Sequence, residues 1–77
     1  MAKAYVLVNT EMGKEEDVLR ALKQIPYVTE AYIIYGVYDL IAKVESDSLE
    51  KVKETVSARI RRLEGVRSTL SMIVVEP

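Results

Sequence analysis

The segment from Tyr35 to Asp39 contains the residues whose types and spacing indicate chemistry most directly. It reads YGVYD and lies between two runs rich in β-branched and aromatic side chains. Gly36 lets the backbone approach a ligand closely, and the N–H groups around it can face a carboxylate. Asp39 can accept hydrogen bonds from an ammonium group. The segment therefore predicts a binding site for a small zwitterion, with a plain hairpin turn and Asp39 as a local acceptor as the alternative.

Two hydroxyl residues near the C-terminus, Thr69 and Ser71, are spaced so that a strand would place both on one face. They could complete a polar lining, and the alternative is ordinary strand composition on a partly solvated face. The chain also has one basic cluster, which consists of Arg59, Arg61, Arg62 and Arg67. We expect this cluster to form a solvated helix face near a helix C-terminus, with contact to phosphate or to an acidic partner as the alternative.

Other kinds of chemistry lack their usual residues. The 77-residue chain has no histidine and no cysteine, so the commonest catalytic base and the commonest zinc ligands are missing. Its 11 basic and 12 acidic residues nearly balance, so the chain has no strong electrostatic field that would attract nucleic acid or an anionic membrane. The apolar stretch at residues 4–8 is too short to span a membrane and does not have the form of a signal peptide. We expect a non-enzymatic cytoplasmic protein with no metal, no cofactor and no direct contact with DNA or membrane.

The elements that must position these residues follow from the periodicity of apolar side chains. Runs of β-branched and aromatic residues predict strands at residues 3–8, 28–35, 38–44 and 66–75. Apolar residues at helical spacing predict a first helix from Lys14 to Pro26. The resulting order, βαββαβ, is the ferredoxin-like arrangement of the α+β class, with two helices on one face of a four-stranded antiparallel sheet. We expect residues 1–77 to form one domain.

A second helix is predicted from an apolar stripe and from signals at both ends. Asp47 is the expected N-cap, and Glu50 three residues later completes a capping box. Gly65 is expected to end the helix at its C′ position. The stripe between them consists of Leu49, Val52, Val56, Ile60 and Leu63.

Both faces of the predicted sheet are expected to be apolar, but two helices can cover only one of them. Hiding several hundred Å² of the second face, at about 25 cal/mol per Å², would contribute on the order of 10 kcal/mol before the cost of association. We therefore expect an obligate dimer or a larger assembly, with an amphipathic monomer as the alternative. The expected interface residues are Tyr5, Leu7, Tyr32, Ile34 and Ile41.

With these features the chain resembles the effector-binding domain of the leucine-responsive (Lrp/AsnC) transcriptional regulators, often called the RAM domain. The resemblance spans nearly all 77 residues and rests on GVYDL at 36–40, Asp47 and Leu49, and LEGVRSTLS at 63–71. It implies a dimeric α+β barrel that forms through the sheets, and dimers that join into rings. It also implies an amino acid bound between dimers near the Gly-x-Tyr-Asp turn.

Residue by residue, the resemblance assigns the turn to Gly36, Tyr38 and Asp39. It assigns the hydroxyl pair of the last strand to Thr69 and Ser71. Ser71 replaces the threonine that is commoner in the family, and it keeps a hydroxyl. Because the sequence begins at the first strand without a helix-turn-helix domain, we interpret it as a stand-alone module that joins full-length regulators in mixed oligomers. A small dimeric α+β barrel enzyme and a purely structural partner protein are the alternatives. The predicted ligand-binding residues are Tyr35, Gly36, Val37, Tyr38, Asp39, Thr69 and Ser71.

Overall fold

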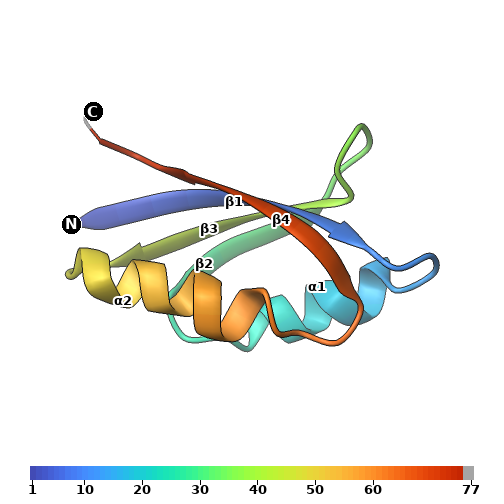
Figure 1. Cartoon of the computed structure of the whole chain (residues 1–77), viewed down its shortest axis with the longest axis horizontal. Helices are drawn as coiled ribbons and strands as arrows, with labels where there is room; N and C mark the ends of the chain where they lie inside the picture. The colour runs from blue at the N-terminus through green and yellow to red at the C-terminus, as the bar shows by residue number, and fades with distance from the viewer. Residues whose placement is uncertain (76–77) are drawn as a thin grey trace.

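Four antiparallel strands form one sheet in the order β2-β3-β1-β4, and the helices lie on one of its faces (Figure 1). This computed structural model describes residues 1–75. Within that range no helix is long and apolar enough to cross a membrane. The predicted ferredoxin-like order βαββαβ is confirmed. The elements are β1 (Ala2–Thr10), α1 (Glu15–Lys23), β2 (Val28–Ile33), β3 (Leu40–Ser46), α2 (Leu49–Glu54), the π-helix η1 (Thr55–Ile60) and β4 (Val66–Ile73).

The core lies between the sheet and the helices. Successive side chains of a strand point to opposite faces, so alternate residues of the two central strands, β1 and β3, point under the helices. α1 and the continuous α2–η1 helix bury their apolar stripes against this layer. The sheet contributes Ala4, Val6, Val8, Leu40, Ala42 and Val44, and the helices contribute Val18, Leu22, Val52, Val56 and Ile60.

The second helix begins and ends at other residues than predicted. Ser48, not Asp47, is the N-cap, because its hydroxyl accepts a hydrogen bond from the Lys51 N–H at 3.3 Å. The regular helix ends at Ile60, so Gly65 is not its C′ residue. Gly65 instead lies in the loop before β4 with a φ of 96°, a backbone conformation that favours glycine.

The π-helical turn keeps the apolar stripe of the second helix on the core. Val52, Val56 and Ile60 are four residues apart, and this spacing drifts around an α-helix with 3.6 residues per turn. The wider turn of η1, in which the Arg61 N–H donates to the Val56 carbonyl at 3.0 Å, offsets the drift. All three stripe residues are buried, whereas the predicted member Leu49 is 43% exposed in the first turn.

The connection between β2 and β3 is longer than the predicted two-residue hairpin turn. β2 ends at Ile33 and β3 begins at Leu40, and we call the segment between them the 34–39 loop. The Ile34 N–H donates to the Asp39 carbonyl at 2.9 Å and closes the loop at its base. The YGVYD segment stands out from one end of the sheet, on the side away from the helices (Figure 1).

The face of the sheet opposite the helices, here the open face, is uncovered in the described chain. Its side chains over β1 and β4 are mainly apolar, and Leu70 and Met72 are 45% and 43% exposed. Toward β2 the face is charged, since Glu30 pairs in register with Lys43. The prediction of an apolar second face is therefore right at β1 and β4 and wrong toward β2. The apolar members are Tyr5, Leu7, Ile41, Leu70 and Met72, with the amphipathic Tyr32 beside them.

Candidate functional site

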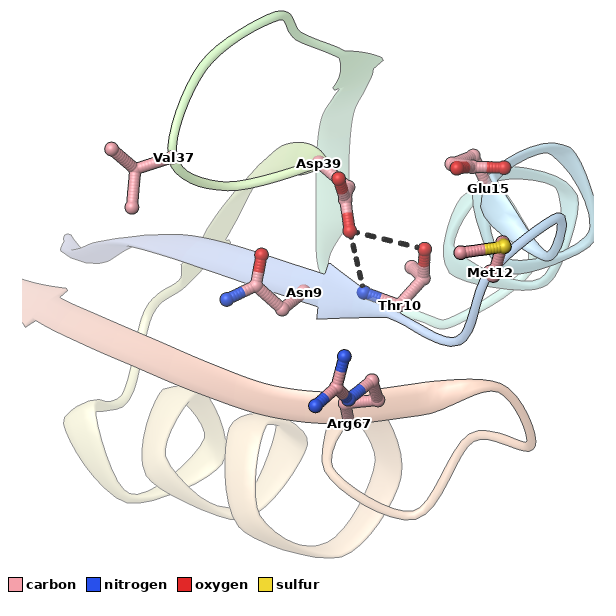
Figure 2. A pocket seen from close by; sticks show the side chains of 7 residues that line it. All are labelled: Asn9, Thr10, Met12, Glu15, Val37, Asp39 and Arg67. Carbon is pink, nitrogen blue, oxygen red and sulfur yellow. Dashed lines mark hydrogen bonds between the residues drawn. The ribbon is translucent and has the colours of Figure 1, made fainter.

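Asp39 anchors the 34–39 loop to the end of β1. Its Oδ2 accepts hydrogen bonds from the Thr10 N–H at 2.8 Å and from the Thr10 hydroxyl at 3.2 Å (Figure 2). The N–H of Asp39 donates to the Val8 carbonyl at 2.9 Å. Asp39 is thus an acceptor for a distant strand and not for a local turn. Its Oδ1 has no hydrogen-bond partner within residues 1–75.

Two hollows flank Asp39 at this end of the sheet, and Glu15 and Asp39 line both. We call the first, of about 410 Å³, the Arg67 hollow, and the second, of about 420 Å³, the Gly36 hollow. The Arg67 hollow is further lined by Asn9, Thr10, Met12, Val37 and Arg67 (Figure 2). The Gly36 hollow is further lined by Glu16, Ile33, Ile34, Tyr35 and Gly36.

Four of the predicted ligand-binding residues, Tyr35, Gly36, Val37 and Asp39, line these hollows. Tyr38 belongs to the same loop and is half-buried, but it lines neither hollow. The side chains of Tyr35 and Val37 are almost fully exposed, with Val37 at 87%. They can enclose a ligand only if something else covers this end of the sheet.

Thr69 and Ser71 lie on the helix side of β4, opposite Val8 and Val6 of β1. Because β1 lies between β4 and β3, Thr69 and Ser71 are two strand spacings, or about 10 Å, from the start of β3. The Thr69 hydroxyl accepts a hydrogen bond from Arg61 Nε at 3.3 Å. The Ser71 Oγ is buried without a hydrogen-bond partner among the described residues. Neither hydroxyl residue lines either of the two hollows beside the 34–39 loop.

Gly36 is not required by the conformation of its own loop. Its φ lies outside the left-handed region, in which the structure places Gly13 and Gly65. A Cβ added to Gly36 would meet no other atom within 4 Å. The interpretation that glycine is there to permit a hairpin turn is therefore wrong. The backbone at Gly36 is bare toward open space.

A model of the Lrp/AsnC ligand binding domain matches residues 3–77. The chain belongs to this family. The resemblance drawn from GVYDL and LEGVRSTLS is thus confirmed.

Relatives of this Lrp/AsnC domain include an uncharacterised HTH-type transcriptional regulator of Pyrococcus abyssi, PYRAB16920, which is 34% identical over 73 residues. The match covers 91% of this chain and 49% of the regulator, so the chain spans about half of that relative's length. The crystal structure of FFRP-DM1 is 40% identical with a TM-score of 0.91, over 97% of this chain and 100% of that chain. The NMB0573/L-Met complex from Neisseria meningitidis shares the fold at 18% identity and a TM-score of 0.83, over 97% of this chain and 50% of that one.

Sequence reasoning missed several residues at the hollows of this Lrp/AsnC domain. Arg67 was grouped with the arginines of the second helix, yet it lies at the start of β4. Glu15, which lines both hollows, and Glu16, which lines the Gly36 hollow, lie in the first turn of α1. The topology itself was the available signal, because the end of β1, the start of α1 and the starts of β3 and β4 meet at one end of an antiparallel βαββαβ sheet. Among residues 1–75 no three His, Cys, Asp or Glu side chains gather closely enough to hold a metal ion.

Proposed function

We propose that this Lrp/AsnC domain is a non-enzymatic, oligomeric module of the cytoplasm that binds a free amino acid and modulates full-length regulators of its family. The observation that carries the proposal is the bare backbone of Gly36 at the rim of a 420 Å³ hollow that also contains Asp39. An amino acid presents a carboxylate beside an ammonium group. Backbone N–H groups of the loop can donate to the carboxylate, and the free Oδ1 of Asp39 can accept from the ammonium.

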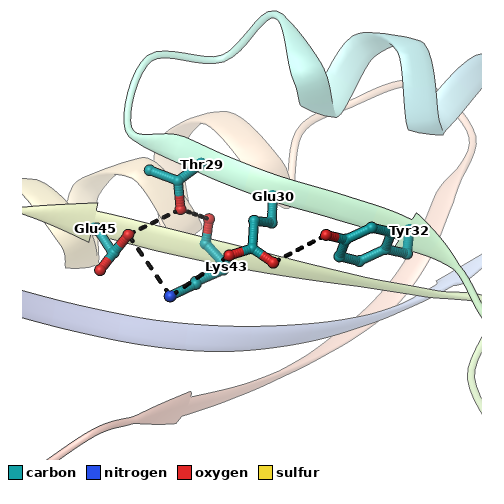
Figure 3. A network of polar contacts seen from close by, with 5 residues as sticks. All are labelled: Thr29, Glu30, Tyr32, Lys43 and Glu45. Carbon is teal, nitrogen blue, oxygen red and sulfur yellow. Dashed lines mark hydrogen bonds and ion pairs between the residues drawn. The ribbon is translucent and has the colours of Figure 1, made fainter.

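Assembly through the open face is the second part of the proposal. Tyr5, Leu7, Ile41, Leu70 and Met72 offer a continuous apolar surface over β1, β3 and β4. Beside it, Lys43 lies between the carboxylates of Glu30 and Glu45, at 3.6 and 3.8 Å, and Glu30 accepts a hydrogen bond from the Tyr32 hydroxyl (Figure 3). An apolar centre with a polar margin is the usual anatomy of a protein interface. A second copy of the chain would cover this face.

A ring of such dimers would complete the ligand site. The 34–39 loop projects from one end of the sheet, whereas Thr69 and Ser71 lie on the helix side of β4. Contact between the loop of one dimer and β4 of the next would bring the predicted residues together.

A panel of the proteinogenic amino acids, followed by thermal unfolding and light scattering, tests ligand binding. A ligand present at about 100 times its Kd should stabilise the folded protein by about 2.7 kcal/mol. Gly36→Val should weaken binding, because a branched side chain would occupy the space above the bare backbone. Ser57→Val, on an exposed turn of η1, is the control. If no amino acid changes the melting temperature or the size of the assembly, the proposal is wrong.

Light scattering of the protein alone tests the assembly. The chain has a mass of 8.7 kDa, and we expect at least twice this mass at micromolar concentration. Leu7→Lys should shift the protein toward the monomer because it places a charge in the apolar centre of the open face. Ser57→Lys adds the same charge on the helix side and should leave the mass unchanged. A stable 8.7 kDa species for the unmodified protein would refute the assembly.

A further inference from the structure

Arg67 points into the hollow that carries its name, across the end of β1 from the two carboxylates of Asp39 and Glu15 (Figure 2). Its side chain forms no ion pair or hydrogen bond with any residue in the range 1–75. Glu15 is half-buried and, within the same range, also has no such partner. Within the described residues, the hollow thus has the unpaired Arg67 cation on one side and, on the other, the unpaired Glu15 carboxylate beside the free Oδ1 of Asp39.

The other arginines of the predicted basic cluster have different surroundings. The Arg61 guanidinium donates to the Thr69 hydroxyl on the helix side of the sheet. Arg59 lines a hollow between η1 and the segment around Tyr27, and Arg62 lies exposed in the loop after η1. Arg67 alone of the four lines a hollow beside the 34–39 loop. The surroundings of Arg67 therefore differ from those of the other three arginines.

The chemistry of the two sides of the hollow is complementary to the two ends of an α-amino acid. A guanidinium offers N–H donors in a planar fork that matches both oxygens of a carboxylate. Ionised carboxylates only accept hydrogen bonds, so Asp39 and Glu15 match the three donors of an ammonium group. A zwitterion in the hollow would pair all three charged groups at once. A hollow of about 410 Å³ has room for such a molecule.

We propose, on the basis of the function proposed above, that Arg67 binds the α-carboxylate of the amino acid and that Glu15, together with Asp39, binds its α-ammonium group. The α-carboxylate then lies in the Arg67 hollow, which Val37 of the loop also lines, and the ammonium group lies at Glu15 and Asp39, which line both hollows. One copy of the chain then carries the charges that recognise any free α-amino acid, and neighbouring copies contact the ligand's side chain. The site discriminates against ligands in which either charged end is blocked.

Calorimetric titration with matched ligands tests this assignment. The probes are the proteinogenic amino acid that binds most tightly to the unmodified protein, its α-amide and its N-acetyl derivative. Arg67→Met should weaken binding of the free amino acid about tenfold, as expected for one charge-assisted hydrogen bond, and should leave the affinity for the amide unchanged. The preference for acid over amide therefore disappears. Glu15→Gln should reduce the preference for the free amine over the N-acetyl form.

Two further variants separate recognition from folding. Arg62→Met removes an exposed arginine that lines neither hollow and should keep both preferences. Arg67→Lys keeps the charge without the planar fork and should retain part of the acid preference even if Arg67→Met folds poorly. If the unmodified protein binds no amino acid, the proposed function fails and the assignment fails with it. If it binds one, and Arg67→Met and Arg67→Lys keep the full acid-over-amide preference, only the assignment of Arg67 is overturned.

Discussion

The carboxylate of Asp39, at the end of the 34–39 loop, accepts two hydrogen bonds from Thr10, a residue 29 positions earlier at the end of β1. One oxygen of Asp39 therefore fastens the loop to the sheet, and the other is left for the hollows. Asp39 thus has a structural role in addition to its proposed contact with the ligand. A loss of ligand binding on substitution of Asp39 would not by itself identify a ligand contact.

Asp39→Ala should lower the free energy of unfolding by about 1–3 kcal/mol, because it leaves the buried Thr10 N–H without its acceptor. Thr10→Val removes only the hydroxyl bond and should cost less, since the backbone N–H bond to Asp39 remains. Urea denaturation at one protein concentration measures both. Equal costs for the two variants would contradict the primary role of the backbone bond.

Gly36→Ala and Gly65→Ala should have opposite effects on stability. Gly36 has open space around it and no left-handed φ, so alanine should be neutral or stabilise the protein by up to about 1 kcal/mol through the unfolded state. Gly65 has a φ of 96°, and a Cβ there would lie 3.0 Å from Val18 Cγ2, so alanine should destabilise by more than that. Thermal unfolding distinguishes the two signs. A destabilised Gly36→Ala protein would restore a structural role for that glycine.

The N-cap of the second helix can be tested with neighbouring residues. Ser48→Ala should cost about 1 kcal/mol, because it removes the side-chain acceptor of the Lys51 N–H. Asp47→Ala should cost less, since the exposed Asp47 side chain loses only a 3.9 Å ion pair with Lys51 and a 3.2 Å hydrogen bond from the adjacent Ser46 hydroxyl. Chemical denaturation of both variants measures the difference. A larger effect at Asp47 would favour the N-cap predicted from the sequence.

Alkaline pH should weaken the polar network at the margin of the open face (Figure 3). The hydrogen bond to the Glu30 carboxylate, with its charge, raises the pKa of Tyr32 above the ordinary value of 10.0. Burial lowers the pKa of Lys43, but the charges of Glu45, Tyr5 and Glu30 raise it more, so the net shift is upward from 10.5. Both groups hold their protons more tightly in the folded state than in the unfolded chain.

The contribution of both groups to stability is therefore complete below about pH 10 and is lost as the pH rises through their folded-state pKa values. Glu30→Gln removes a cause of both shifts. The difference in unfolding free energy between the unmodified protein and Glu30→Gln should be largest below about pH 10 and should narrow above it. Denaturation at a series of pH values and at fixed protein concentration measures this difference. A constant difference across the range would exclude the linkage to Tyr32 and Lys43.

The sequence by itself determined the family and the order of elements. These follow from local signals: the two-residue alternation in β1 and β3, the helical spacing around Val18 and Leu22, and the motif residues at 36–40 and 63–71. The sequence did not decide at which residue the second helix begins. Adjacent Asp47 and Ser48 are both good N-cap residues, and only the backbone conformation at Ser48 decides between them.

Only the tertiary structure decided which side chains share the site. Asp39 and Thr10 meet because β3 and β1 are neighbours in the sheet, and Arg67 and Glu15 join them because β4 and α1 begin at the same end. The same pairing places Thr69 and Ser71 on the helix side of an edge strand, away from the loop in the same copy. These relations depend on contacts between segments far apart in the chain, and local periodicity carries no information about which distant side chains will face one another.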